Sequence, residues 1–226
     1  QQCSSQYQSA RWMDDNNIGH RTFHLTAHAH RDHYGIAQWN ASTTFALVRH
    51  PLARQVSLFF FLLHNCERNA NKCQNHDPFI PTDGSVTSNS TEEEKIQAFH
   101  DWIHTLYETY NTSTNSTNSK QNYLLGSIGH GNEVYATFNA TQSSWLVDET
   151  GQHIVVEHVW KLESISHDLL QTNIPCLSSS KNNEMKHANP SPSYPHYTRF
   201  ANNEKTNAIM RDVYAVDYRN FEYELP

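Results

Sequence analysis

Two arginines and a serine are spaced to bind a phosphate group. Residues 44–48 form an apolar run that predicts a buried parallel strand, and Arg49 follows it directly. Pro51 is typical of a first helical turn, so Arg54 and Ser57 fall on the helix that follows. A guanidinium donates two parallel hydrogen bonds to a phosphate, and a hydroxyl adds a third. Open α/β sheets bind ligands beyond the carboxyl ends of their strands, so this segment indicates a phosphate site.

A second group of reactive residues lies upstream, in the stretch His28-Ala-His30-Arg-Asp32-His33. A neutral imidazole with a pKa of about 6.5 can take a proton from a hydroxyl group near neutral pH. The same residue types, packed on a loop after a strand, also suit a zinc pair that activates water. The chain holds 16 histidines, so the cluster alone does not choose between these two chemistries.

The elements that would position these groups alternate between strands and helices, which predicts an α/β fold in one domain over residues 1–226. Thr91-Glu-Glu-Glu94 is a capping box that opens a helix. The remaining predictions are a hairpin with arms at 145–147 and 153–159, a short helix at 164–172, a closing helix at 202–221, and polar loops at 65–90, 111–122 and 178–198.

The net charge is −7, which argues against nucleic acid as a partner, while a local basic pocket could still hold one compact anion. The phosphate segment supplies such a pocket in the sequence. The net charge therefore excludes little beyond a general nucleic-acid coat, and a nucleotide phosphate stays a possible ligand.

The phosphate segment also resembles a known family. Arg49-His-Pro-Leu-Ala-Arg54-Gln-Val-Ser57-Leu-Phe is similar to the sulfotransferase motif Arg-Asp-Pro-x-x-Arg-x-x-Ser-x-Tyr. The segment around Leu162-Glu163 and Asp168 resembles the family's Arg-Phe-Glu-x-Leu-x-x-Asp. The ending from Asp212 to Tyr223 resembles its terminal helix Tyr-x-x-Asp-Phe-x-x-Phe-x-Tyr. The likeness covers roughly residues 20–63 and 140–226 in order, and heparan sulfate and uronyl 2-O-sulfotransferases resemble the chain most.

This resemblance implies a P-loop-like fold with a central parallel sheet flanked by helices. It implies that Arg49 and Ser57, with Arg54, hold the 3′-phosphate of 3′-phosphoadenosine 5′-phosphosulfate. His30 would be the base on the acceptor hydroxyl, with His28 as its orienting partner or substitute. The acceptor would be a glycan or another hydroxyl compound, and the reaction would need no metal.

The chain departs from the family at two points. His50 stands where the motif has Asp, and no Lys-rich or Arg-rich loop for the 5′-phosphosulfate is visible before Arg49. We expect an amino-terminal part of the fold to lie outside this chain, in which case the chain alone would be inactive.

Two alternatives stay open at this point. His28, His30, Asp32 and His33 match the His-x-His-x-Asp-His motif of metallo-β-lactamases, with Gly129-His130 as a candidate later ligand segment. That fold needs a glycine-rich sheet before the motif, which the residues before His28 do not supply. The third reading is a catalytically inactive, glycosylated binding domain.

Five sequons and four cysteines favour a lumenal or secreted context. Cys66 and Cys73 could pair across a short loop, leaving Cys3 and Cys176 as a second pair. No apolar run is long enough to span a membrane. The resemblance implies a Golgi protein of the type II membrane class, with its anchor upstream. The sequon asparagines are Asn40, Asn89, Asn111, Asn115 and Asn139.

Overall fold

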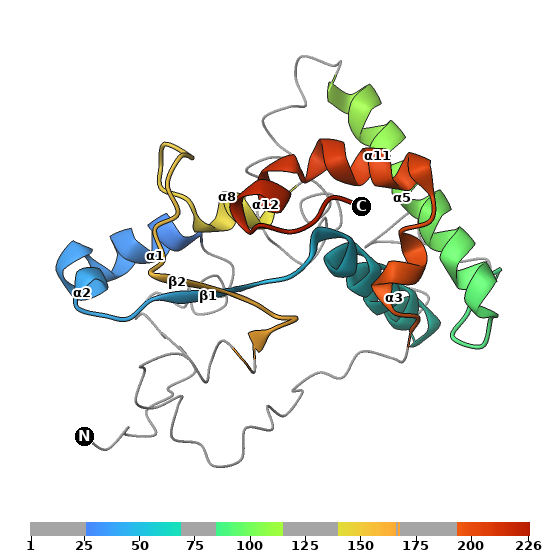
Figure 1. The fold of residues 1–226 in the computed structure, drawn as a ribbon, viewed down its shortest axis with the longest axis horizontal. Helices are drawn as coiled ribbons and strands as arrows, with labels where there is room; N and C mark the ends of the chain where they lie inside the picture. The colour runs from blue at the N-terminus through green and yellow to red at the C-terminus, as the bar shows by residue number, and fades with distance from the viewer. Residues whose placement is uncertain (1–25, 69–84, 115–139, 166, 168–193) are drawn as a thin grey trace, which may run out of the picture. The chain divides into compact units, whose positions relative to one another are not determined.

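The computed structural model describes residues 26–68, 85–114, 140–165, 167 and 194–226 (Figure 1). The chain divides into two compact units, each described by itself below. The sheet unit comprises residues 1–48 and 144–188, and the helical unit comprises residues 49–143 and 189–226. The sequence predicted one domain over residues 1–226, and the division into two compact units does not test that prediction.

The sheet unit contains two parallel strands, β1 (Phe45–Val48) and β2 (His158–Lys161). They pair in register from Phe45 with His158 to Val48 with Lys161. Two helices precede β1 in the chain, α1 (Ala27–Tyr34) and α2 (Ile36–Asn40). The described residues therefore form a mixed structure with a small parallel sheet, which confirms the α/β class at a coarse level. The finer fold type stays a prediction.

The strand predicted at residues 44–48 is confirmed, but its predicted burial is wrong. Val48 is buried, whereas Phe45 and Leu47 are 46% and 49% exposed. The alternation arises because successive strand residues point to opposite faces. Phe45 and Leu47 lie on one face of β1 and are both exposed, whereas a buried parallel strand is covered on both faces.

The predicted hairpin is present in a shorter form. Val147 and Ile154 form an antiparallel bridge, and Gly151 allows the turn through its φ of +74°. The Asp148 carboxylate accepts from the Thr150 hydroxyl at 2.6 Å and orders the turn. The arm predicted at 153–159 is divided: its start closes the hairpin, and its end belongs to β2.

The helical unit is built around α3 (Pro51–Arg68) and α5 (Glu92–Thr114). Both predicted starts are confirmed. Pro51 is the first residue of α3, and the Thr91 amide and Glu94 side chain bond at 2.8 Å in a capping box that precedes α5. Apolar side chains of α3, α5 and the closing helices form one core. Its fully buried members include Leu52, Phe59, Phe99, Trp102, Ile103, Leu106, Phe200, Met210 and Tyr214.

The predicted closing helix is confirmed with a break. It consists of α11 (Glu204–Val213) and α12 (Ala215–Asn220), which meet at the fully buried Tyr214. Asn203 caps α11 by accepting from the Thr206 amide at 3.0 Å. Two short elements complete the unit's path: the helix α8 (Gln142–Leu146), which crosses the unit boundary, and the 3₁₀ helix η2 (Tyr197–Phe200).

The first two polar loops predicted from composition begin later than expected, because α3 continues to Arg68 and α5 to Thr114. The third predicted loop ends earlier, because η2 overlaps its last two residues. Helical hydrogen bonding therefore extends into polar sequence, where composition alone predicts a loop. The other parts of these loops, and most of the helix predicted at 164–172, lie outside the described residues.

The described residues bear on the secretory-pathway markers. Cys66 is disulfide-bonded, while Cys3, Cys73 and Cys176 lie outside the described residues. Asn40, Asn89 and Asn111 are exposed, so these three sequons are accessible. Asn115 and Asn139 lie outside the described residues. Among the helices that the structure describes, none combines the length and the apolar character needed to cross a membrane.

Candidate phosphate site and histidine helix

The backbone of Arg49 is held by one glutamine side chain. The Arg49 amide donates to Gln142 Oε1 at 2.8 Å, and Gln142 Nε2 donates to the Arg49 carbonyl at 2.7 Å. A primary amide carries a donor and an acceptor side by side, so it pairs with both backbone groups of one residue. Arg49, the first of the two residues between β1 and α3, is thereby held on both sides of its Cα.

Gln142 is itself fixed by a buried carboxylate. Asp217 Oδ2 accepts from the Gln142 amide at 2.8 Å, and its Oδ1 accepts from the Ser143 amide at 2.7 Å. Asp217 is 0% exposed and Ser143 is buried. The Asp217 carboxylate thus accepts from both of the first two amides of α8. Carboxylates are favoured at helix starts because the first amides of a helix have no acceptor within the helix. Asn220 adds a bond to the Ser143 hydroxyl at 3.2 Å.

The guanidinium of Arg49 is directed by a tyrosine. Its Nη2 donates to the Tyr194 hydroxyl at 3.3 Å. The Tyr194 ring stacks on Phe60 of α3, with centroids 4.9 Å apart and planes 2° apart. Because arginine has five N–H donors, this bond orients the fork while occupying a single donor. The half-buried Arg49 is thus pre-oriented by its backbone and by its side chain.

Arg54 and Ser57 lie three residues apart on α3 and share one face of the helix. Both are half-buried. Arg54 Nη1 donates to the Ala140 carbonyl at 3.0 Å, and the Arg54 amide donates to the His50 carbonyl at 2.9 Å. The structure therefore keeps all three predicted phosphate-binding residues in the helical unit, with Arg49 at the start of α3 and the other two along it.

His50, which replaces the acidic residue of the resembling motif, is packed among aromatic rings. It stacks on Tyr197 at 4.8 Å and meets Tyr218 and Tyr223 edge-on at 5.5 Å and 5.2 Å. An imidazole suits this aromatic setting better than a carboxylate, which would be costly to bury there. Compared with the Asp of the motif, His50 also places one negative charge fewer next to Arg49.

The predicted catalytic histidines lie on α1 in the sheet unit, where Thr26 is the N-cap. His28 Nδ1 lies 3.0 Å from Thr26 Oγ1, and the His30 ring stacks on Tyr34 at 6.2 Å. Two residues along a helix correspond to about 200° around its axis, so the imidazoles of His28 and His30 point to different sides. Helix geometry thus separates His30 from the partner predicted for it.

Burial lowers the pKa of His30, and the neighbouring His33 lowers it further. Desolvation disfavours the charged imidazolium, and a second imidazole adds like-charge repulsion when protonated. His30 is therefore neutral at neutral pH and able to accept a proton. His33 lies three residues from His30, on the same side of α1, and is the histidine that acts on it.

The zinc alternative expects its ligands on a loop that follows a strand, and the structure has them on a helix. His28, Asp32 and His33 belong to α1 together with His30. Within the part of the chain that the structure describes, no cluster of three or more His, Cys, Asp or Glu residues is placed to hold a metal ion. Gly129-His130 lies outside the described residues.

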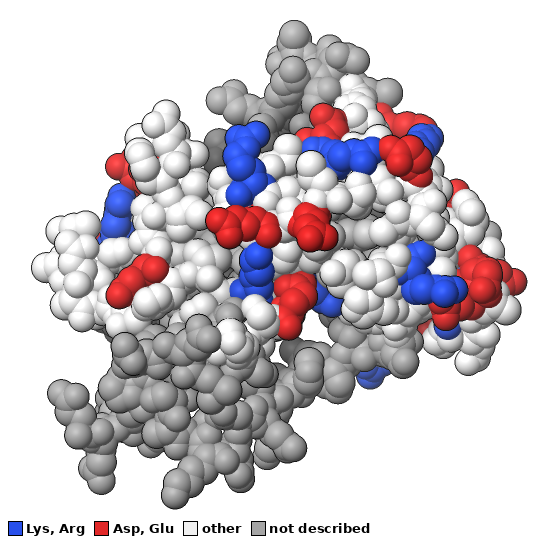
Figure 2. All heavy atoms as spheres, in the orientation of Figure 1, with Lys and Arg blue, Asp and Glu red and all other residues white. Residues whose placement is uncertain are grey.

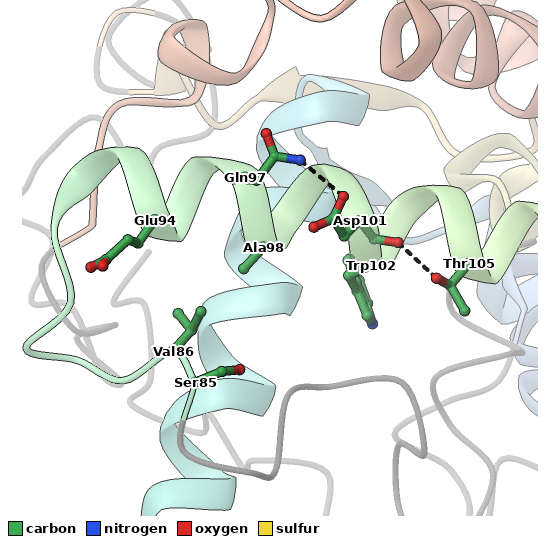
Figure 3. A pocket seen from close by; sticks show the side chains of 8 residues that line it. All are labelled: Ser85, Val86, Glu94, Gln97, Ala98, Asp101, Trp102 and Thr105. Atoms are coloured by element: carbon green, nitrogen blue, oxygen red, sulfur yellow. Dashed lines mark hydrogen bonds between the residues drawn. The ribbon is translucent and has the colours of Figure 1, made fainter.

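A cavity of about 310 Å³ lies in the helical unit beside α5, and Figure 3 shows its lining. Glu94 and Asp101 stand on α5, and Val86 faces them from the preceding segment. Carboxylates repel a phosphate, and none of the three predicted phosphate-binding residues lines this cavity. The cavity is thus separate from the candidate phosphate site.

Charges of both signs are interspersed on the face that Figure 2 shows. Several cations of the helical unit are paired with carboxylates. Arg199 lies 2.8 Å from Glu92, and Lys205 lies 3.3 Å from Glu108. On this face the described residues form no basic patch, and the positive groups that we consider for an anion are the half-buried Arg49 and Arg54.

No protein-family model, curated protein or solved structure matches the chain. The residues of the site carry the functional argument alone. Sequence reasoning assigned no role to Gln142 or Asp217, because their partners lie 93 and 75 positions away and no local pattern marks them.

Proposed function

We propose that the chain is a sulfotransferase of the P-loop-like fold, acting on a hydroxyl group with 3′-phosphoadenosine 5′-phosphosulfate as donor. The observation that supports this proposal is that hydrogen bonds fix both the backbone and the side chain of Arg49. Its backbone is clamped by Gln142 and its guanidinium is oriented by Tyr194, at the start of a helix that carries Arg54 and Ser57. Preorganised cations are the groups that phosphate and sulfate transfer requires.

The proposed reaction moves a sulfuryl group without a covalent enzyme intermediate. The acceptor oxygen bonds to sulfur, the bond between sulfur and the 5′-phosphate oxygen breaks, and 3′-phosphoadenosine 5′-phosphate leaves with the electron pair. His30 takes the hydroxyl proton, for which its lowered pKa keeps it neutral. Arg49, Arg54 and Ser57 bind the 3′-phosphate and so hold the nucleotide. A glycan is the proposed acceptor.

We place this activity in the lumen of the Golgi or another secretory compartment. Disulfide bonding of Cys66 supports an oxidising compartment, and the exposed Asn40, Asn89 and Asn111 support glycosylation there. A mass shift on treatment of the secreted chain with an N-glycosidase checks this placement.

The test of the phosphate site is calorimetric titration of the full-length protein with 3′-phosphoadenosine 5′-phosphate. We expect Arg49→Ala to weaken binding at least about 100-fold, because two charge-assisted hydrogen bonds are lost. Arg68→Ala is the matched control, since Arg68 is exposed at the opposite end of the same helix. Its affinity should stay within about twofold of the wild type.

Adenosine 5′-monophosphate makes the test specific, because it lacks the 3′-phosphate. The wild type should bind it more weakly, and Arg49→Ala should bind both nucleotides alike. Equal affinity of the wild type for the two nucleotides, or no binding of either, would contradict the proposal.

A further inference from the structure

The strongest unexplained feature of the helical unit is the polar chain that runs from Asp217 through Gln142 to Arg49. It is made of four hydrogen bonds of 2.7–2.8 Å among residues distant in sequence. We infer that Gln142 is a positioning residue for Arg49 and that Asp217 acts through Gln142. This inference rests on the proposed function and names residues outside the set that binds phosphate.

The first step is the chemistry of Gln142. Its amide donates to the Arg49 carbonyl and accepts from the Arg49 amide. An ionised glutamate would set a second acceptor against that carbonyl, and asparagine is shorter by a methylene group. Methionine keeps the length and most of the volume of the side chain while removing both hydrogen bonds. These differences make the role of Gln142 testable by substitution.

The second step is the placement of Gln142 itself. Both oxygens of Asp217 are occupied by successive amides, those of Gln142 and Ser143. Ionised carboxylates make roughly the strongest hydrogen bonds available to backbone amides, and burial keeps water from competing for them. Asp217 therefore fixes where α8 starts, and with it the point from which the Gln142 side chain reaches Arg49.

The third step is the effect on a ligand. A guanidinium whose backbone is already held loses less conformational freedom when it binds a phosphate. Removing the Gln142 bonds leaves the charge of Arg49 in place but frees its main chain. The affinity for a 3′-phosphate should then fall by about threefold to tenfold, which is less than the loss expected for Arg49→Ala.

The experiment compares two nucleotides on Gln142→Met. The titrations use 3′-phosphoadenosine 5′-phosphate and adenosine 5′-monophosphate, and melting temperatures confirm that each variant is folded. A positioning role weakens the first nucleotide by about threefold to tenfold and leaves the second within about twofold. A merely structural role would lower both affinities by the same factor. Gln142→Glu should lose at least as much selectivity as Gln142→Met.

Gln97→Met is the matched control. Gln97 is exposed on α5 and donates to Asp101 at 2.9 Å, so this variant loses a glutamine hydrogen bond elsewhere in the helical unit. Its nucleotide selectivity should equal that of the wild type. Asp217→Asn gives a second measurement, because one of the two amides it serves then faces a donor instead of an acceptor. In the folded fraction of Asp217→Asn, the preference for the 3′-phosphorylated nucleotide should fall as it does in Gln142→Met.

Two results overturn different statements. A wild type without preference for the 3′-phosphorylated nucleotide removes the proposed function. A wild type with that preference, retained in full by Gln142→Met, overturns the positioning role and leaves the proposed function standing.

Discussion

The two units of the molecule differ in how firmly they hold their candidate residues. In the helical unit, Arg49 lies in a chain of part-buried and buried hydrogen bonds, and the unit has a continuous apolar core. In the sheet unit, His30 belongs to an eight-residue helix with Ala27 as its buried residue, and Phe45 and Leu47 of β1 are about half exposed. The candidate phosphate-binding residue Arg49 is therefore held by several contacts in one unit. The candidate base His30 lies on a short helix with one buried residue in the other unit.

The difference between the two units agrees with the different requirements of a phosphate site and a general base. A phosphate site gains affinity from donors that are already oriented, because ordering them on binding costs free energy. A general base depends more on its pKa, which burial and His33 set for His30 with few fixed contacts. The contrast predicts that substitutions in the two units affect different measurements.

The largest effect is expected for His30→Gln. In the full-length protein, which supplies the upstream part of the fold, the rate of sulfate transfer from 3′-phosphoadenosine 5′-phosphosulfate to a desulfated polysaccharide should fall about 10²- to 10⁴-fold. Nucleotide affinity should stay within about twofold, since the residues that we propose bind the phosphate are in the helical unit. Because burial lowers the pKa of His30, the wild-type rate should persist somewhat below pH 6.5. His28→Gln should cost less than His30→Gln, and equal losses in both variants would contradict the assignment.

The next effect concerns stability of the helical unit. Phe59→Ala should lower the free energy of unfolding by about 3–5 kcal/mol, because Phe59 is fully buried and a cavity remains. Phe61, on the same helix, is 56% exposed, and Phe61→Ala should cost under about 1 kcal/mol. Urea denaturation of the two variants checks the difference. Similar costs would mean that the core is less continuous than its packing indicates.

An acid-dependent loss of stability should follow from the pair His100 and His104. His100 Nδ1 and His104 Nε2 lie 2.8 Å and 3.1 Å from the same Thr206 hydroxyl, which can donate to one imidazole only. Burial, with a smaller contribution from His104 and opposed by Asp101, lowers the pKa of His100 to about 4. His100 is 2% exposed, so protonation is coupled to opening of the contact between α5 and α11.

The sign follows from linkage. The pKa of His100 is lower in the folded than in the unfolded chain, so the unfolded chain binds more protons as the pH falls below about 6.5. Stability should be full above that pH and decrease towards pH 4, by about 2 kcal/mol between pH 7 and pH 4.5. His100→Gln should lose much less over this interval in urea denaturation. An unchanged pH dependence in this variant would refute the coupling.

The smallest effect is expected in the sheet unit. Phe45→Ala removes a half-exposed ring that stacks on Trp160 at 5.0 Å, and the cost should be about 1 kcal/mol. Denaturation followed by tryptophan fluorescence measures it. A cost as large as that of Phe59→Ala would erase the contrast between the units.

Local signals predicted the starts of the elements well and their ends less well. The Pro51 start of α3 and the Thr91–Glu94 capping box depend on neighbouring residues alone, and both are confirmed. The burial of β1 was overestimated because an apolar run indicates a strand but not how many layers cover it. The break at the fully buried Tyr214 also escaped prediction, since the apolar spacing continues across it.

The site divides in the same way. Spacing alone placed Arg49, Arg54 and Ser57 around one strand end and the following helix, and the structure has that strand and that helix. The helix that carries His28 and His30 was not predicted, and it directs the two side chains to different sides. The contacts of Gln142 and Asp217 are tertiary, and only a folded structure shows them.

The long sequence separations within the polar chain have a consequence for biosynthesis. Arg49, Gln142 and Asp217 come from the early, middle and last parts of the chain, so their bonds close loops of about 75 and 93 residues. Contacts between residues this far apart form late in folding, because closing such a long loop has an entropic cost that earlier contacts must first offset. During translation the bonds from Asp217 to the Gln142 and Ser143 amides can form only after α12 has been made. Until then Gln142 lacks the contact that we infer positions it for Arg49.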